Sequence, residues 1–235
     1  MHVSSYGLSD IGRVRERNED AYLIDERQSV FAVADGLGGL PEGARASQLT
    51  VELLEKELGR GRVLLNMKTL FGKMNLEILL LGKRLSPDTG IGTTMTTVAL
   101  GEESLDIAHV GDTAVYRFRS DGFEKLTRDH TLEEEIRNRP DYNPLVPIPR
   151  RHSHVLTRCL GQIEDLEIDT YAYQPASGDR LLLCTDGITL AITAEEIHPR
   201  MLAAATPESI VRELVDLANE RGGRDNATAV AVFID

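Results

Sequence analysis

The sequence predicts an α+β fold in which antiparallel sheet lies in the middle and helices lie outside. Short apolar, β-branched runs recur along the chain, and short turn signals such as Asp121-Gly122 lie between some of them. This close spacing favours antiparallel pairing over a regular alternation of strands and crossover helices. Longer segments with apolar residues three and four positions apart interrupt the runs and indicate helices.

The strand candidates are the short apolar runs, which carry the residue types that suit a pleated, half-buried surface. Each is bounded by turn residues or by a change in hydrophobic period. They cover residues 21–24, 30–34, 95–100, 105–110, 114–118, 168–173, 180–184 and 227–234.

Helical spacing marks two places in the chain. Between the second and third strand candidates, apolar residues repeat through 51–58 and again through 67–78, so two helices fit, divided near Gly59-Arg60-Gly61. A further helix is predicted to begin at Thr206-Pro207, where a capping residue precedes proline at the first helical position. It is predicted to end at Gly222-Gly223.

A proline- and arginine-rich stretch at about 133–154 breaks this pattern. Its prolines are predicted to exclude regular structure, and its arginines concentrate positive charge. We interpret it as a surface flap inserted into a single domain that spans residues 1–235. The prolines are Pro140, Pro144, Pro147 and Pro149, and the arginines are Arg137, Arg139, Arg150 and Arg151.

Composition excludes several classes of protein. The net charge of −12 has the wrong sign for binding nucleic acid or an anionic membrane by bulk electrostatics. No segment reaches the roughly 18 apolar residues of a membrane span, and the first residues do not resemble a signal peptide. Cys159 and Cys184 lie too far apart to suggest a disulfide framework or a zinc site. We therefore expect a cytoplasmic protein, with a monomer as the default.

Aspartates stand at the ends of the apolar runs. Asp35, Asp112 and Asp186 follow such runs, whereas Asp20 and Asp225 precede them. In antiparallel sheet the end of one strand and the beginning of its neighbour share a rim, so all five side chains can converge. Crowded carboxylates repel one another unless cations neutralise them, and hard oxygen ligands select Mg²⁺ or Mn²⁺. The pattern predicts a metal site, although any single Asp-Gly pair is more simply an ordinary turn.

Short motifs recur in order over nearly the whole chain. They are Ser9–Asp20, Val33–Gly39, Gly92–Thr94, His109–Asp112, Thr127–Thr131, Leu183–Gly187 and Gly223–Thr228. Each motif is weak by itself, and the ordered set is specific. Together they resemble the metal-dependent (type-2C) protein phosphatases in their compact bacterial form.

The resemblance implies a four-layer α-β-β-α sandwich, with two central antiparallel sheets flanked by helix pairs. It also implies two core Mn²⁺ or Mg²⁺ ions at one end of the sandwich and a weaker third ion. The residues it assigns to them are Asp35 bridging the two ions, the Gly36 carbonyl on the first, Asp186 and Asp225 on the second, Asp112 with Asp186 on the third, Glu19 and Asp20 acting through waters, and Asn226 supporting the ligands.

The implied activity is hydrolysis of phosphoserine and phosphothreonine in proteins by a hydroxide that bridges the two ions, opposite a Ser/Thr kinase. Arg15 matches the position whose guanidinium clamps the phosphate, although a solvated side chain in the run Arg13, Arg15, Arg17 is the simpler alternative. A catalytically silent phosphoprotein-binding relative is the main alternative function. A two-metal hydrolase of small phosphoesters is a remoter one.

One departure from the family concerns the proton for the leaving group. Many relatives carry histidine in the loop after the Asp-Gly pair, where this chain has Leu37 and Leu40. A water on the metal or a histidine from elsewhere would have to act as general acid. Among the histidines, we expect His109 to pack against the sheet and His130 to be structural. We expect His152 and His154 to lie in a solvated flap, and their spacing leaves a metal-binding pair as the alternative. If the flap covers the site, its arginines would surround it. Thr93 and Thr94 are expected to support the sheet.

Overall fold

Two five-stranded antiparallel sheets form the centre of the computed structural model, which describes residues 2–38, 42–60, 66–163 and 165–235. The first sheet has the order β1 (Val3–Asp10), β10 (Ala227–Ile234), β9 (Arg180–Cys184), β6 (Ala114–Arg119), β7 (Gly122–Lys125). The second has the order β2 (Asp20–Asp25), β3 (Val30–Asp35), β4 (Met95–Leu100), β5 (Leu105–Val110), β8 (Asp169–Tyr173).

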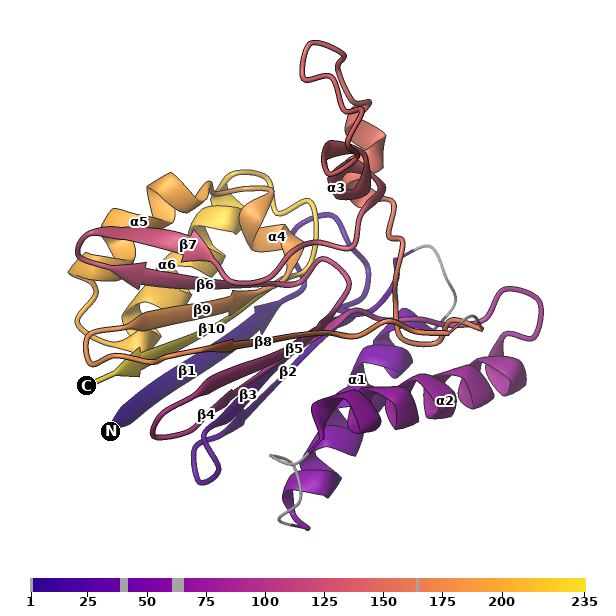
Figure 1. Ribbon diagram of the computed structural model, residues 1–235, viewed down its shortest axis with the longest axis horizontal. Helices are drawn as coiled ribbons and strands as arrows, with labels where there is room; N and C mark the ends of the chain where they lie inside the picture. The colour runs from indigo at the N-terminus through magenta and orange to yellow at the C-terminus, as the bar shows by residue number, and fades with distance from the viewer. Residues whose placement is uncertain (1, 39–41, 61–65, 164) are drawn as a thin grey trace.

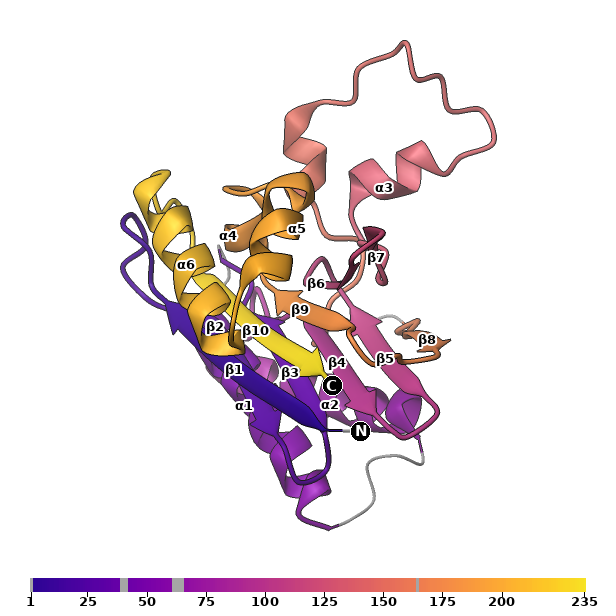
Figure 2. The same ribbon diagram turned by 90° about the vertical axis from the view of Figure 1, so that its left-hand side faces the viewer.

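Helices cover the outer faces of both sheets, as Figures 1 and 2 show. The second sheet is covered by α1 (Gly43–Leu58) and α2 (Met67–Leu85). The first sheet is covered by α5 (Ala194–Ala203) and α6 (Pro207–Glu220), with the short α4 (Asp186–Thr189) beside them. The predicted four-layer sandwich is confirmed.

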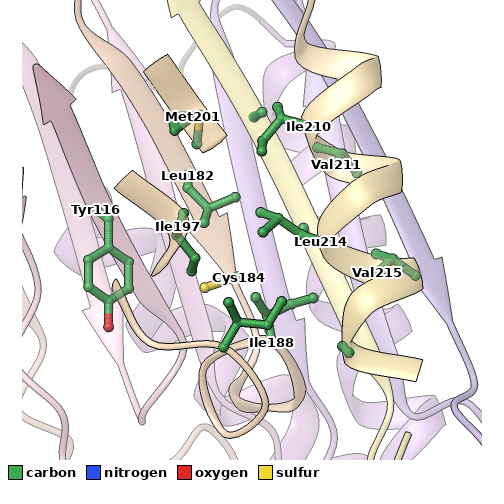
Figure 3. Packing of buried hydrophobic residues seen from close by; sticks show 14 of the residues in the cluster. Tyr116, Leu182, Cys184, Ile188, Ile197, Met201, Ile210, Val211, Leu214 and Val215 are labelled. Atoms are coloured by element: carbon green, nitrogen blue, oxygen red, sulfur yellow. The ribbon is translucent and has the colours of Figure 1, made fainter. Parts of the chain in front are cut away.

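Burial on both faces explains why the central strands are continuous apolar runs. In β10, Ala229 and Ala231 pack under the helices, whereas Val230 and Val232 point between the sheets. Successive side chains of a strand point to opposite faces, so both sets must be apolar. Figure 3 shows the outer layer, where α6 lays Leu214 and its neighbours over the sheet. Truncating such a buried leucine to alanine costs about 2–5 kcal/mol.

The predicted caps of α6 are present. Thr206 accepts a hydrogen bond from the Ser209 backbone N–H at 3.1 Å, and Pro207 occupies the first turn. After the helix, Gly222 and Gly223 have φ of 123° and 50°, values that favour glycine. The expected division after α1 begins at Gly59, whereas Gly61 lies outside the described residues.

Several elements were not predicted. β1 has a mostly polar sequence and pairs along its whole length with β10, so its conformation comes from its partner. β7, α4 and α5 were also missed, each being short or polar. The prediction that the flap lacks regular structure was wrong at both ends: α3 (Leu132–Arg137) begins it and a 3-10 turn at Arg150–His154 closes it. The flap prolines follow α3, and Thr131 caps that helix.

Candidate metal centre

The rim predicted from the aspartate pattern exists at one end of the sandwich. Asp20 and Asp35 are direct partners in the β2–β3 ladder. Asp186 begins α4 immediately after β9, and Asp225 lies just before β10, which pairs antiparallel with β9. The end of one strand and the beginning of the next therefore meet, as antiparallel geometry requires.

A pocket of about 210 Å³ lies at this rim and collects most of the predicted site residues. Asp20 lies beneath it and is not part of its lining. The lining consists of Arg15, Glu19, Asp35, Gly36, Leu37, Gly38, Thr94, Asp112, His154, Leu156, Asp186, Asp225 and Asn226.

Asp20 is buried and joins the two sheets below the pocket. Its Oδ2 accepts hydrogen bonds from Thr185 Oγ1 at 2.8 Å and Thr228 Oγ1 at 2.6 Å, both from the opposite sheet's side of the rim. Its Oδ1 has no hydrogen-bond partner among the described residues. Burial, only partly offset by these two hydrogen bonds, raises the pKa of Asp20 to about 7. A buried carboxylate oxygen without a partner is available to a cation or its water.

Asp35 is held by its backbone. Its N–H donates to Thr94 Oγ1 at 3.1 Å, and its carbonyl accepts from Thr93 Oγ1 and from the Thr94 N–H, each at 2.8 Å. Burial raises the pKa of Asp35 well above its usual value, and the charges of Asp20 and Asp186 raise it further. Thr93 and Thr94 therefore hold the backbone at the end of β3, which is the support of the sheet that the sequence predicted.

Asp112 and Asp186 are also buried near other carboxylates, and their pKa values are raised in the same way. Burial, followed by the charge of Asp186, raises the pKa of Asp112 to about 7. Burial, followed by the charge of Asp225, raises the pKa of Asp186 to about 6. Mutual repulsion in a shared pocket is relieved when a cation enters, since opposite charge favours the ionised carboxylate.

The donor set fits Mg²⁺ or Mn²⁺. Within the described ranges, no three Asp, Glu, His or Cys side chains already form the ligand set of one ion. Mg²⁺ normally takes one or two protein carboxylates and keeps several waters, so a looser arrangement of oxygens suits it. Gly36 lets the backbone pass close to its neighbours: a Cβ there would lie 2.3 Å from the Gly43 carbonyl oxygen and 2.8 Å from that of Glu19. The backbone at Gly36 can therefore lie in the pocket wall.

Arg15 enters the pocket from the loop before β2. Its Nη2 donates to Asp225 Oδ2 at 2.7 Å, and its side chain stays 41% exposed. That hydrogen bond raises the pKa of Arg15 above its ordinary value. Gly38 lies alongside, because a Cβ there would be 2.8 Å from Arg15 Nη1. The guanidinium is thus anchored at one side, and its remaining N–H groups can reach an anion in the pocket.

Asn226 ties the Arg15 loop to the rim. Its Oδ1 accepts from the Glu19 N–H at 2.8 Å, and its Nδ2 donates to the carbonyls of Ile11 and Arg17, each at 2.9 Å. Burial raises the pKa of Glu19, which also lines the pocket. Glu19 and Asn226 thus lie where the sequence placed them, with Asn226 acting as a structural clamp.

His154 lies in the flap with its side chain 53% exposed, as predicted, and its ring also lines the pocket, with Nδ1 4.0 Å from Asp186 Oδ2. Leu37 lines the same pocket, whereas Leu40 lies outside the described residues. A histidine from elsewhere in the chain therefore lies beside Asp186 in the pocket wall. The spacing of His154 from the motifs gave no signal for this, because the flap's path was not predictable.

Arg137 and Arg139 of the flap do not line the pocket. The tip of the flap projects away from the body in Figures 1 and 2, and Leu145 is 89% exposed there. Arg137 pairs with Glu133 on α3, and Arg139 lines a separate hollow within the flap. The Arg150 side chain lies outside the described part of the chain. The flap arginines were expected to surround the site only if the flap covers it, and in this arrangement its tip does not.

Two residues that support the site were missed. Thr185 and Thr228 hold Asp20, and the Thr228 N–H also donates to Thr185 Oγ1 at 3.1 Å. Both belong to motifs already noted, but a hydroxyl beside an aspartate is too common to assign. His109 is buried as predicted, with its ring bonded to Thr96 Oγ1 at 2.7 Å and to the Arg128 carbonyl at 3.0 Å.

Comparison with known proteins agrees with this geometry. The family described as protein phosphatase 2C matches residues 12–225. The chain is 29% identical over 234 residues to the serine/threonine phosphatase stp of Listeria innocua, covering 95% of this chain and 93% of that protein. It is also 29% identical over 241 residues to the protein phosphatase PhpP of Streptococcus pneumoniae, covering 97% and 96% respectively.

Solved structures give the same result. The serine/threonine phosphatase PstP/Ppp of Mycobacterium tuberculosis has a TM-score of 0.86 and 29% identity, with 99% of each chain covered. The catalytic domain of PstP in complex with two manganese ions has a TM-score of 0.83 and 28% identity, again with 99% of each chain covered.

Proposed function

This chain belongs to the protein phosphatase 2C family, and from that premise we propose how its own residues serve the reaction. It is a metal-dependent protein phosphatase that removes phosphate from serine and threonine side chains. The observation that carries this function is the shared pocket of Asp35, Asp112, Asp186 and Asp225, with Arg15 at its edge.

The residues divide into those that hold ions and those that hold substrate. Asp35, Asp186, Asp225 and the Gly36 carbonyl would hold the two core ions, and Asp20 and Glu19 would act through waters. When bound, the ions supply a hydroxide for in-line attack on phosphorus and neutralise the charge of the phosphoryl oxygens. Arg15 binds two of those oxygens through its planar guanidinium and orients the phosphate. The 2.7 Å bond to Asp225 keeps the guanidinium in place before substrate arrives.

The donor set supports the type of ion, and a related structure supports the number of core ions. We infer Mn²⁺ or Mg²⁺ because all the donors in the proposed set are oxygens. The PstP catalytic domain carries two manganese ions, which supports two core ions here. Asp112 lies in the same pocket beside Asp186 and would hold a weaker third ion with it.

The setting of the enzyme is also part of the proposal. We infer phosphorylated proteins as substrates, an opposing Ser/Thr kinase, a monomer, and a cytoplasmic location. Residues 1–235 would form a single catalytic domain with the flap as an insert. Among the described helices, none is both long enough and apolar enough for a bilayer span.

The decisive experiment uses a phosphoserine peptide and a phosphothreonine peptide. We expect phosphate release with added Mn²⁺ and arrest by a chelator, with recovery when Mn²⁺ is restored. Turnover that continues in the chelator would exclude the metal mechanism. If no divalent metal supports turnover while the peptides still bind, the chain is the silent phosphoprotein-binding relative instead.

A further inference from the structure

A row of polar contacts runs from Arg158 through Asp169 and His130 to the backbone beside Asp112. Arg158 Nη1 donates to Asp169 Oδ1 at 2.8 Å, and Asp169 Oδ2 lies 3.3 Å from His130 Nε2. On the other side of the same ring, the Gly111 N–H donates to His130 Nδ1 at 3.0 Å. Sequence positions 111, 130 and 169 thus meet at the end of β5, where the chain turns into the pocket.

The geometry fixes the tautomer of His130. A backbone N–H can only donate, so Nδ1 must carry the lone pair and Nε2 the proton. Burial lowers the pKa of His130, which keeps the ring neutral with a single proton. Arg158 Nη1 also lies 3.3 Å from Nε2, but it cannot donate there while Nε2 is protonated. The Nε2 proton therefore points to Asp169.

Gly111 is held on two sides by this arrangement. The His130 N–H donates to the Gly111 carbonyl at 2.7 Å, so residues 111 and 130 are bonded in both directions. On the opposite side, a Cβ on Gly111 would lie 2.4 Å from Thr94 Cβ, and Thr94 is the residue that holds the Asp35 backbone. Gly111 has φ of 110°. The residue before Asp112 therefore has little room to move.

We propose that Asp169 is a positioning residue of the metal centre, which fixes the His130 tautomer and thereby the Gly111-Asp112 backbone. The inference rests on the proposed function, in which Asp112 holds the third ion. Nothing in the family motifs points to Asp169, which lies on the edge strand β8. Partners outside the coordination shell that orient a metal's ligands are worth about 10–100-fold in metal affinity, and a residue that fixes the backbone of a ligand acts in the same way.

The substitution Asp169→Asn tests the proposal because the site needs a carboxylate. Three donors converge on Asp169: Arg158 on Oδ1, and Tyr171 Oη at 2.9 Å together with His130 on Oδ2. An amide offers one acceptor oxygen, so at least one donor faces its NH₂ group. In Asp169→Asn, His130 Nε2 can instead accept from the amide or from Arg158. The proton then moves to Nδ1, where it opposes the Gly111 N–H.

The experiment combines a spectroscopic and a binding measurement on the full chain. The ¹⁵N shifts of the His130 ring should report the Nε2–H tautomer in the wild type and a shift toward Nδ1–H in Asp169→Asn. Calorimetric titration with Mn²⁺ should show about tenfold weaker binding at the weakest site and unchanged binding at the tighter pair. An unchanged tautomer, or unchanged binding at every site, would overturn the proposal.

Two controls separate positioning from general damage. Glu167→Gln removes the 3.2 Å ion pair with the other side of Arg158, where Glu167 is 80% exposed, and should leave tautomer and binding unchanged. In His130→Asn, the amide oxygen can accept the hydrogen bond from the Gly111 N–H, but there is no ring tautomer for Asp169 to select. Adding Asp169→Asn to this variant should therefore cause no further loss of Mn²⁺ binding. A further loss in the double variant would assign Asp169 a merely structural role.

The outcome is distinct from failure of the proposed function. The tautomer of His130 is read without metal, substrate or turnover. If the wild type fails to hydrolyse either phosphopeptide yet the tautomer changes in Asp169→Asn, the positioning inference stands and the activity falls. If the wild type is active and the His130 tautomer does not change in Asp169→Asn, the proposed activity stands and the positioning inference is overturned.

Discussion

The metal-site rim and the flap lie close together but are built in opposite ways. At the rim, Thr185 holds Asp20 across 165 residues of sequence, and Arg15 holds Asp225 across 210. In the flap, Arg137 pairs with Glu133, four residues away on the same helix. The rim is thus a product of the whole fold, whereas the flap depends on local contacts. Substitutions at the rim should affect chemistry, and substitutions in the flap should be weakly felt.

The two regions also differ in how charge is placed. The rim buries several like charges together, which is unfavourable until a cation enters. The flap exposes its charges to water, where an ion pair is worth about 0–1 kcal/mol. Substitutions at the rim are therefore expected to have larger effects than substitutions in the flap.

The largest effect is expected for Asp35→Asn. It removes a charge that would bridge both ions, whose stabilisation of the transition state is worth several kcal/mol. We expect kcat/KM on phosphopeptides to fall at least about a thousandfold, since each ~1.4 kcal/mol is a factor of ten. Asp88→Asn, at an exposed turn, is the matched control and should be neutral. Near-normal turnover of Asp35→Asn would break the assignment of the rim.

Arg15→Ala should come next. Loss of a charged hydrogen-bond donor to the phosphate costs about 1.5–3 kcal/mol, a factor of roughly 10 to 150. We expect the loss chiefly in KM, measured by steady-state kinetics on a phosphoserine peptide. An unchanged KM would return Arg15 to the solvated surface, the alternative that its neighbours Arg13 and Arg17 suggest.

His154 tests the border between the two regions, because it belongs to the end of the flap yet lines the pocket. If it protonates the leaving alkoxide, His154→Asn should lower kcat on a phosphoserine peptide by about 10²-fold, the low end for general acid catalysis. An aryl phosphate has a better leaving group and should be affected far less. Equal losses on both substrates would indicate a role in the shape of the pocket.

Stability without metal should fall as pH rises. The pKa of Asp20 and of Asp112 is about 7 in the folded protein and that of Asp186 is about 6, against ~3.9 for an unfolded aspartate. The folded state therefore binds more protons at these three groups between these values, so their contribution to stability is full below about pH 4 and is lost toward pH 7. Thermal unfolding in a chelator should show this decline, and saturating Mn²⁺ should reverse it. A flat profile in the chelator would mean that the carboxylates are not crowded.

The smallest effect is expected in the flap. Arg137→Ala breaks an exposed i,i+4 pair with Glu133 and should leave the free energy of unfolding almost unchanged, because water screens the pair. Turnover of an aryl phosphate should stay within about twofold of the wild type, as expected of a surface change. A large loss of activity would mean that the flap closes over the pocket during turnover. The difference between the rim and the flap would then hold only without substrate.

The candidate site was more predictable than the elements that support it. Asp35 and Asp186 can be identified from the sequence because each follows an apolar run. Antiparallel pairing then predicts that they lie at a common rim. No sequence pattern marks Asp169, because its role depends on contact with His130, which lies 39 positions earlier in the chain. β1 shows the same limit for the fold: its polar sequence adopts a strand because β10 provides a ladder for it.

The sequence by itself determined the alternation of apolar runs, the capped helix at Thr206 and the acidic residues that gather at the strand ends, because each depends on neighbours in the chain. Only the tertiary structure decided that His154 reaches the pocket, that Arg137 and Arg139 of the flap lie away from it, and that Thr185 and Thr228 hold Asp20. Those facts depend on which distant segments lie within hydrogen-bond range, and a hydrogen bond fails over about half an ångström beyond its normal length. No local pattern carries distances of that precision.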